Sequence, residues 1–420
     1  MLRSVPLESG GDPLELVRPL LAEPGAVLAF DGPRAVFGCR PVARSLDLDP
    51  EPTLCLAPGA SDAPRWFGLL PYEAFRSWER RPAEDSRARP LLDHVLWHRY
   101  GAVAVFDQAG ARVEGDDPAA VEWLRDALVR RRAERTAPLA PVRLELREPL
   151  ESSEIHERRI SRALSQIAAG NLYQVNLARR FEFRVAGHPV EILRALGHPA
   201  RTTFASAGAF EELSWVSASP ELFLSLDAEG TLVTRPIKGT RPRGVTSDED
   251  ARLRRELDES EKERAELAMV IDVERNDLGR ISAPGTVRLT TPPHVVTHAT
   301  IHHREAAVTS RLRPGVSRAE LLRATLPSGS VTGAPKIRAM ELIAELEAER
   351  RGLYTGALGW LGHDGSLRLS MAIRVLTIRG DRGHYFAGGG IVADSDPAAE
   401  VEETLWKARQ LAALAPVLRG

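Results

Sequence analysis

Short strand-like runs separated by proline and glycine dominate the first 130 residues. Residues 26–30, 35–38 and 102–106 are small apolar and aromatic runs, and they predict short strands. Residues 118–135 show the clearest helical pattern in this part, and they end in a run of arginines before Thr-Ala-Pro-Leu-Ala-Pro. We interpret this end as a charged helix terminus and a linker rather than a nucleic-acid-binding segment.

From about residue 150 the pattern changes to alternating helices and strands. Ile160, Leu164 and Ile167 form one apolar stripe, which predicts an amphipathic helix over 154–169 that ends at the Gly-Asn pair that follows. Further elements are predicted as a strand over 173–183 and as helices over 261–273, 335–348 and 398–414.

Composition narrows the classes of function. The chain has 420 residues, 43% of them hydrophobic, which is enough for a large core. The formal net charge of -2 gives no electrostatic reason to expect nucleic acid or an anionic membrane as partner. The two cysteines, Cys39 and Cys55, indicate neither a disulfide framework nor a zinc site. Because the sequence has neither an apolar signal core nor an apolar run of about 18 residues, we expect a cytoplasmic protein.

Lys238 is the most informative single residue. It lies between an isoleucine and Gly239, at the end of an alternating run over residues 231–237. A lysine on such a turn can be held away from water, which lowers the pKa of its amine and makes it a nucleophile. On this stretch alone, a hairpin lysine that points to solvent is the alternative.

Four glutamates stand in contexts that suit acid–base or metal chemistry. Glu400 and Glu403 are three residues apart in a predicted helix and therefore share a face. Glu266 lies within a predicted helix beside an apolar stripe, and Glu221 follows a Ser-Pro pair. Carboxylates without Cys or His partners suit a hard cation such as Mg²⁺, whereas a solvated first helical turn is the alternative for the Glu400–Glu403 pair.

Two glycine-rich segments predict a close approach of backbone or ligand. Residues 327–336 lead into a helix whose free N–H groups would hold an anion, and residues 387–391 contain three consecutive glycines. Neither has the spacing of a Walker loop or a dinucleotide fingerprint. Arg275 and Arg374 are candidates for carboxylate binding, with a structural ion pair as the alternative for each.

Four histidines cluster at His294, His298, His302 and His303. Because adjacent strand residues face opposite sides, His302 and His303 are not expected to form a metal pair. One of them is a candidate acid–base or orienting residue, and the sequence leaves the choice open.

Read in order, these segments resemble the chorismate-utilising enzymes, a family that includes the synthase subunits for anthranilate, aminodeoxychorismate, isochorismate and salicylate. The resemblance covers about residues 150–415, and the N-terminal part adds mainly Gly-Leu-Leu-Pro-Tyr-Glu at 68–73. The segments that carry it are Tyr-Gln-Val-Asn-Leu at 173–177, Ser-Pro-Glu at 219–221, Arg-Pro-Ile-Lys-Gly-Thr at 235–240, Arg-Ala-Glu at 264–266, Asp-Val-Glu-Arg-Asn-Asp-Leu-Gly-Arg at 272–280, Gly-Ala-Pro-Lys-Ile-Arg-Ala-Met-Glu at 333–341, and Gly-Gly-Ile-Val-Ala-Asp-Ser at 389–395 with Glu400 and Glu403.

The resemblance implies an α/β (α+β) fold like that of anthranilate synthase component I. In this fold, packed antiparallel β-sheets carry helices outside and hold the active site between them. We expect a strand-rich N-terminal region, residues 1–145, packed on the same body as a chorismate-binding catalytic domain, residues 150–418.

Within the family, Lys238 and the Tyr-Gln-Val-Asn segment look like aminodeoxychorismate synthase component I. Anthranilate synthases have alanine in place of Lys238, and isochorismate and salicylate synthases have a water-activating lysine in place of Gln174. The resemblance therefore implies conversion of chorismate and ammonia to 4-amino-4-deoxychorismate, for p-aminobenzoate and folate synthesis. Ammonia would come from a separate glutamine amidotransferase subunit, and no nucleic-acid or membrane partner is expected.

The resemblance also implies roles for individual residues. Lys238 would add to ring carbon 2 as the 4-hydroxyl leaves, with Glu221 as acid–base and His303, or else His302, as the active-site histidine. Mg²⁺ would be held by Glu266, Glu400 and Glu403. The substrate-binding residues would be Thr240, Thr332, Gly333, Tyr354, Arg374, Gly388, Gly389, Gly390 and Lys407.

Three departures from the family pattern bear on substrate contacts. The usual His-Leu-Val-Ser is His-Arg-Glu-Ala at 303–306, Ile-Arg-Thr is Ile-Arg-Val at 373–375, and Val401 replaces an aromatic residue. Three alternatives stay open: anthranilate synthase component I, an isochorismate- or salicylate-type synthase, and a non-catalytic chorismate-binding homologue.

Overall fold

A computed structural model describes residues 2–7, 11–51, 53–76, 87–133, 142–147, 151–195, 203–211, 213–298 and 301–412. Up to residue 147 the elements are β1 Arg3–Leu7, α1 Pro13–Val17, a 3₁₀ turn η1 Arg18–Leu20, β2 Val27–Asp31, β3 Arg34–Gly38, β4 Ala43–Ser45, β5 Pro64–Leu70, α2 Glu73–Arg76, β6 Leu96–Arg99, β7 Ala102–Asp107, β8 Gly110–Gly115, α3 Pro118–Ala133 and β9 Arg143–Leu146.

The remaining elements are α4 Ser153–Ala168, β10 Gln174–Ala186, α5 Pro189–Ala195, β11 Phe204–Ala209, β12 Ser214–Ser219, β13 Leu222–Leu226, β14 Thr231–Arg235, β15 Ile237–Pro242, α6 Ser247–Glu259, α7 Glu261–Gly279, β16 Arg288–Thr297, β17 Ile301–Arg311, α8 Arg318–Thr325, a 3₁₀ turn η3 Gly329–Val331, β18 Gly333–Ala334, α9 Lys336–Leu346, β19 Ala357–Gly362, β20 Leu367–Met371, β21 Val375–Arg379, β22 Arg382–Ile391 and α10 Pro397–Ala412.

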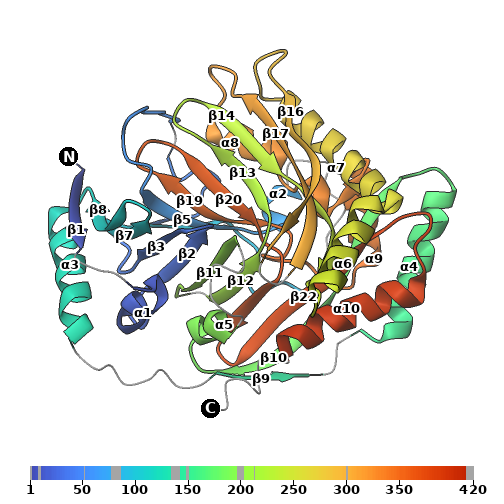
Figure 1. The fold of residues 1–420 in the computed structure, drawn as a ribbon, viewed down its shortest axis with the longest axis horizontal. Helices are drawn as coiled ribbons and strands as arrows, with labels where there is room; N and C mark the ends of the chain where they lie inside the picture. The colour runs from blue at the N-terminus through green and yellow to red at the C-terminus, as the bar shows by residue number, and fades with distance from the viewer. Residues whose placement is uncertain are drawn as a thin grey trace.

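Two antiparallel sheets form the body of the molecule (Figure 1). Sheet A has twelve strands in the order β1-β8-β7-β3-β2-β11-β12-β21-β22-β10-β18, with β9 paired to β10. Sheet B has ten strands in the order β15-β17-β14-β13-β20-β19-β5-β6-β4, with β16 paired to β17. In the described chain, β2 pairs with β11 and β5 pairs with β19, so strands from both ends of the sequence share each sheet.

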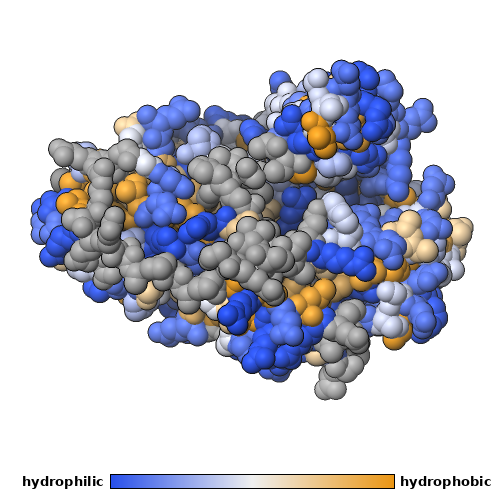
Figure 2. Space-filling view, turned by 60° about the horizontal axis from the view of Figure 1, so that its bottom comes forward, coloured by the Kyte–Doolittle hydropathy of each residue, from blue (hydrophilic) through white to orange (hydrophobic). Residues whose placement is uncertain are grey.

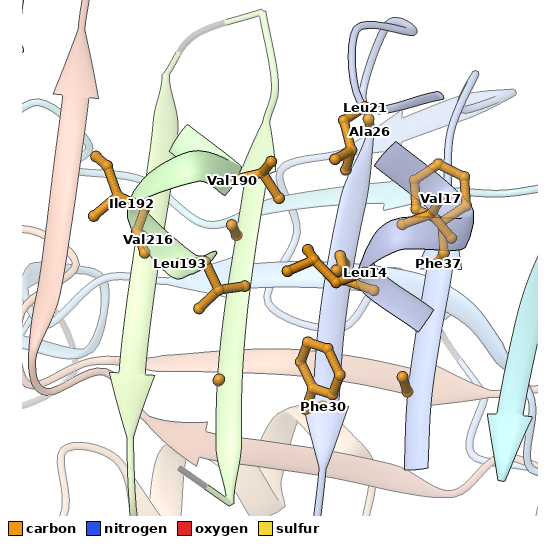
Figure 3. Close-up of a cluster of buried hydrophobic side chains, with 14 of the residues drawn as sticks. Leu14, Val17, Leu21, Ala26, Phe30, Phe37, Val190, Ile192, Leu193 and Val216 are labelled. Atoms are coloured by element: carbon orange, nitrogen blue, oxygen red, sulfur yellow. The ribbon is translucent and has the colours of Figure 1, made fainter. Parts of the chain in front are cut away.

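Apolar side chains fill the space between the two sheets, and they also pack between the outer face of each sheet and the helices that cover it. Val36 and Trp215 of sheet A share one cluster with Phe67 and Leu358 of sheet B. On the outer face of sheet A, α1 and α5 cover β2, β3, β11 and β12 with side chains such as Leu14 (Figure 3). Helices α7 and α8 cover sheet B, and α4, α9 and α10 cover the β10–β22 end of sheet A. The predicted α/β class with packed antiparallel sheets and outer helices is confirmed.

Several predicted elements have nearly the predicted bounds. The strand predicted over 173–183 is β10, and the helices predicted over 154–169, 335–348 and 398–414 are α4, α9 and α10. The helix predicted over 118–135 is α3, and the linker predicted after it lies outside the described residues. In the described part of the chain, no helix has the length and apolar character to cross a membrane.

Two predictions of element bounds are wrong, and both concern segments next to Lys238. The alternating run over 231–237 is two strands, β14 and β15, because Pro236 has no N–H to continue the ladder. The helix predicted to end at 273 continues to Gly279, because Glu274 and Asp277 are buried with polar partners and do not end the apolar face.

Candidate active site

The candidate site forms where β15, at one end of sheet B, meets α7 and the β22–β10 end of sheet A with α10. In Figure 1, α7 and α10 lie near these strands at the right of the molecule. Figure 2 shows that the surface on its right side is hollowed by a recess lined mainly by hydrophilic residues.

Lys238 is half-buried in β15, and its strand register pairs it with Arg304 of β17. The next residue, Gly239, forms a bulge and has φ +76°. A Cβ atom at Gly239 would lie 2.7 Å from Leu257 of α6 and 2.8 Å from Glu263 of α7. The glycine therefore allows β15 to contact both helices, and this contact brings Lys238 to the carboxylates of α7.

Glu221 lies in the turn between β12 and β13 and is 4% exposed. Burial raises the pKa of this carboxyl to about 7, and the nearby negative charge of Glu274 adds to the rise. A hydrogen bond from Ser330 Oγ at 2.7 Å and the positive charge of Lys238 oppose that rise. A carboxyl with a pKa near neutrality exchanges protons readily at physiological pH.

Two of the three proposed metal ligands share one electrostatic environment. Burial raises the pKa of Glu266 on α7; Lys238 lowers it, and Glu400 of α10 raises it. The pKa of Glu400 is raised by burial and by Glu403, although Ser395 Oγ donates to it at 2.8 Å. A cation would relieve two half-buried carboxylates whose pKa values are both raised by burial and by a neighbouring glutamate, so Glu266 and Glu400 fit a hard metal ion.

Glu403 is arranged differently from the other two metal candidates. Its carboxylate forms a 2.6 Å ion pair with Lys407, one helical turn further along α10, and it is about half exposed. Across the described residues, no three His, Cys, Asp or Glu side chains converge as a preformed metal site. Glu403 would therefore have to leave Lys407 to join a cation held by Glu266 and Glu400.

The three glycines of β22 lie beside this cluster, and each has different neighbours. A Cβ atom at Gly389 would lie 2.7 Å from Glu400 Oε2, and one at Gly390 would lie 2.3 Å from Gln174 Nε2. Gly388 offers its carbonyl to Lys407 Nζ at 2.7 Å. These positions need glycine because neighbouring atoms, the Leu177 carbonyl at Gly388 and side chains at the other two, lie against the strand.

Three other predicted substrate contacts line different parts of the same region. Arg374 has φ +51° at the turn before β21. It is solvent-accessible, yet desolvation lowers the pKa of its guanidinium. Tyr354 is partly buried and stacks on Phe386 with 5.4 Å between ring centroids, while burial raises the pKa of its hydroxyl. Thr240 is exposed on β15.

Thr332 and Gly333 are buried and hold backbone in place. The Thr332 hydroxyl donates to the Ser328 carbonyl at 2.7 Å. Gly333 has φ +141°, and a Cβ atom there would lie 2.2 Å from the carbonyl oxygen of Gln174. Helix α9 begins only at Lys336, whose ammonium reaches back to Asp277 and to the Pro327 carbonyl. The ammonium group at this helix start is thus already paired with a carboxylate of the protein.

The two adjacent histidines of β17 have different partners. His302 bonds Thr297 Oγ1 at 2.9 Å and Asp250 at 2.8 Å, within a network that includes Arg243. His303 lies 3.0 Å from His298, measured between their Nε2 atoms. In the ladder His303 is opposite Thr240, and Lys238 is opposite Arg304 rather than either histidine.

Arg275 forms an exposed ion pair with Asp272 at 3.2 Å, which is the structural alternative considered for it. A different, buried arginine, Arg351, was not predicted from the sequence. Arg351 bonds Glu347 at 2.6 Å through Nη2 and stacks over the rings of Tyr72 and Tyr354.

Sequence reasoning also missed Glu274, Ser328 and Ser330, which lie beside Glu221. Glu274 follows Leu267, Val270 and Ile271 on the buried face of α7, so its helical spacing among apolar residues was the available signal.

The positions of the lysines are a second sequence feature that marks the candidate site. The chain has 56 lysines and arginines, and only four of these are lysines: Lys238, Lys262, Lys336 and Lys407. Lys262 acts electrostatically on both Glu266 and Glu400, Lys336 pairs with Asp277 of α7, and Lys407 pairs with Glu403. All four thus lie on or beside the candidate site.

Comparison with known proteins places this geometry in a family. The family described as "chorismate binding enzyme" matches residues 32–413. This chain belongs to that family.

The relatives of this chorismate-binding enzyme carry two different activities in their names. Anthranilate synthase component 1 of Streptomyces coelicolor is 38% identical, over 97% of this chain and 78% of the relative. Aminodeoxychorismate synthase component 1 of Klebsiella aerogenes is 36% identical, over 87% of this chain and 79% of the relative. A crystal structure of anthranilate synthase component I from Streptococcus pneumoniae TIGR4 aligns with a TM-score of 0.75 at 28% identity, covering 98% of this chain and 92% of that one. The family is established by these matches, and the choice between the two aminations has to come from the site.

Proposed function

We propose that this chorismate-binding enzyme is aminodeoxychorismate synthase component I, with ammonia delivered by a separate glutamine amidotransferase. The observation that carries the proposal is that the charge of Lys238 acts on Glu221, a buried carboxyl whose pKa is raised to about 7. A lysine amine and a carboxyl that can exchange protons near pH 7 would suit displacement of a hydroxyl through a covalent intermediate.

One proton transfer prepares both groups. If Glu221 takes a proton from the Lys238 ammonium, the amine becomes a nucleophile and the carboxyl becomes an acid. The amine then bonds to ring carbon 2 of chorismate, the ring double bonds shift, and the bond from carbon 4 to the hydroxyl breaks. Glu221 protonates the departing hydroxyl, which leaves as water.

Ammonia completes the exchange by bonding to carbon 4. The double bonds shift back, and the bond from carbon 2 to Lys238 breaks, which releases the amine. The proton lost by the new nitrogen returns to Glu221, so the sum is chorismate and ammonia to 4-amino-4-deoxychorismate and water. Covalent catalysis thus divides one difficult displacement into two easier ones.

The carboxylates of the site complete the proposal. Mg²⁺ would be held by Glu266 and Glu400, joined by Glu403, and when bound it would neutralise the ring carboxylate of chorismate. Arg374 and Tyr354, with the backbone of Gly388–Gly390, would orient the substrate. A histidine of β17 would assist, with His303 as our assignment.

Anthranilate synthase component I remains the second candidate, because relatives with that name match the chain as well as those of the first. The lysine pattern favours the first candidate. In a chain that uses arginine almost everywhere, a half-buried strand position beside two carboxylates holds a lysine.

Product analysis decides between the candidates. The purified chain is incubated with chorismate, Mg²⁺ and ammonium, and products are separated and identified by mass spectrometry. We expect 4-amino-4-deoxychorismate from the unmodified chain and none from Lys238→Ala or Lys238→Arg. Lys262→Arg is the matched control, since it makes the same lysine-to-arginine change at an exposed position and should keep the product. Anthranilate as the main product, or aminodeoxychorismate formation that survives Lys238→Ala, would overturn the proposal.

A further inference from the structure

A continuous hydrogen-bonded chain joins Glu221 to a second carboxyl deep in the protein. Ser330 Oγ donates to Glu221 Oε1 at 2.7 Å and lies 3.0 Å from Ser328 Oγ. Ser328 Oγ in turn bonds Glu274 Oε1, while the other oxygen of Glu274 accepts from Thr234 at 3.0 Å. All five side chains are buried, so bulk water does not compete for these contacts.

The fold brings the two serines to α7 through a single glycine. Gly329, between them in η3, lies so close to the helix that a Cβ atom there would be 2.4 Å from Val273. The neighbouring residue of α7 is Glu274. No larger residue at 329 would let both hydroxyls bridge Glu274 and Glu221 with the turn in this position.

The number of hydrogens decides whether every contact from Glu274 to Glu221 can be a hydrogen bond. Glu274–Ser328, Ser328–Ser330 and Ser330–Glu221 are three contacts, and each requires one hydrogen. The two hydroxyls supply two hydrogens. If both carboxyls are ionised, each serine donates outward and the 3.0 Å contact between the hydroxyls has no proton. The chain is complete only when the two carboxyls together hold one additional proton.

The chain is complete with that proton at either end. With the proton on Glu274, the donors run from Glu274 through Ser328 and Ser330 to Glu221. With it on Glu221, every donor reverses. In both cases the Ser328 oxygen keeps a lone pair for the Ser330 N–H, which lies 3.0 Å away. Moving the proton therefore exchanges O–H bonds along the chain without moving a heavy atom.

We propose that Glu274, Ser328 and Ser330 form a proton relay that resupplies Glu221 during turnover. This inference rests on the proposed role of Glu221. The shared proton lies on Glu274 while Glu221 takes a proton from the Lys238 ammonium and gives it to the departing hydroxyl; the two hydroxyls then pass the shared proton from Glu274 to Glu221. When Glu221 accepts a proton from the nitrogen bonded to carbon 4, the shared proton returns to Glu274 by the same route, so the pair never holds fewer than one proton. Glu274 touches no substrate, so it is a positioning residue that acts through Glu221.

The charges around the relay suit both of its states. Glu274 is faced by Lys336 of α9, which stabilises its anion, and by Asp277 of α7, which pairs with the same lysine. At the other end, Glu221 is faced by Lys238. Each end has a cation in range, so neither position of the shared proton leaves a buried carboxylate uncompensated.

Glu274→Gln and Ser330→Ala test the relay, with Thr234→Val as the matched control. Thr234→Val removes a bond to the other oxygen of Glu274 but leaves all three relay contacts. We expect kcat to fall on the order of a hundredfold in both relay variants, the low end for loss of general acid–base assistance. The control should stay within about twofold of the unmodified enzyme, because its relay contacts are intact.

The pH profile separates a relay from a packing role. Glu274→Gln removes a negative charge that raises the pKa of Glu221, so the alkaline limb of kcat should move to lower pH. Ser330→Ala removes a hydrogen bond that lowers the same pKa, so the limb should move to higher pH. Opposite shifts with similar losses of rate support the relay. Wild-type kcat in Glu274→Gln, or limbs that do not move in either variant, would overturn it.

A direct titration keeps this test independent of the reaction assigned. Infrared spectra of the resting protein across the neutral range should show carboxyl titration that changes in both Glu221→Gln and Glu274→Gln if the pair shares a proton. If the product proves to be anthranilate, the proposed function fails while this titration still reports the shared proton. Titration in which the Glu221 step is the same with and without Glu274 would refute the relay, whatever the product.

Discussion

Two sets of glutamates in this enzyme have the same side chain and opposite surroundings. Glu221 and Glu274 are buried between the sheets and α7, and their direct partners are hydroxyl groups. Glu400 and Glu403 lie on the first turns of α10, beside lysine ammonium groups and a glycine-lined strand. Burial in a dry site favours a carboxyl that keeps a proton, although the hydroxyl partners oppose this, whereas partly solvated carboxylates that repel one another favour a cation.

The neighbours of a carboxylate, more than its spacing in the sequence, therefore decide its chemistry. Each set should therefore respond to a different kind of perturbation. The buried pair should be sensitive to changes in proton occupancy, and the α10 pair to changes in metal concentration.

The largest effect is expected from Glu221→Gln. Loss of the general acid should lower kcat roughly a thousandfold, within the usual range for such a group. The same change should stabilise the folded protein at pH 8. Because the folded pKa is raised from 4.5 to about 7, the stabilising protonated form is lost as the pH rises through 7.

Thermal unfolding at two pH values checks whether Glu221→Gln stabilises the folded protein at high pH. At pH 8 the native carboxylate is ionised in a dry site, at a cost of up to about 3 kcal/mol that the amide does not incur. At pH 5 the carboxyl is protonated and the two proteins should differ little. Equal melting temperatures for variant and unmodified protein at both pH values would contradict the buried-acid description.

A smaller effect is expected from Ser395→Ala at the metal end. Ser395 Oγ donates to Glu400 at 2.8 Å and fixes its carboxylate. Loss of such a supporting bond typically lowers metal affinity about 10- to 100-fold. We expect the Mg²⁺ concentration for half-maximal activity to rise by that factor, with kcat at saturating Mg²⁺ unchanged.

Ser165→Ala on α4 is the control for this prediction, because its hydroxyl bonds only a helix carbonyl among the described residues. Calorimetric titration with Mg²⁺ gives the affinity without turnover. An unchanged Mg²⁺ requirement in Ser395→Ala would remove Glu400 from the metal site.

The sequence was sufficient to predict the fold class and most elements after residue 150. The amphipathic stripe of α4 and the glycine that ends it predicted that helix within one residue at each end. Local patterns did not reveal the pairing of β2 with β11 or of β5 with β19, because register between distant strands depends on the whole sheet. Pro236 in the sequence is a reason to expect two strands, β14 and β15, but the alternating apolar and polar residues around it favoured one strand.

The candidate site was predicted in part for a similar reason. Lys238, Glu221 and Glu266 stand in recognisable motifs, and the structure places their charges within range of one another. Ser328 and Ser330 were hidden because a serine beside a glycine is ordinary turn composition. Their importance depends on Gly329 against Val273, a contact between segments more than 50 residues apart.

The smallest effect is expected at Arg275, where spacing suggested a carboxylate contact and the structure shows an exposed pair with Asp272. Pairs of this kind contribute about 0.2–0.5 kcal/mol, so Arg275→Ala should change the melting temperature little and leave the KM for chorismate unchanged. Arg374→Ala is the informative counterpart. Its guanidinium has no salt-bridge partner among the described residues and is free to bind a substrate carboxylate, so removing it should raise KM clearly. If Arg275→Ala raised KM as much as Arg374→Ala, substrate would have to reach the outer face of α7, and the active site would have been placed on the wrong side of that helix.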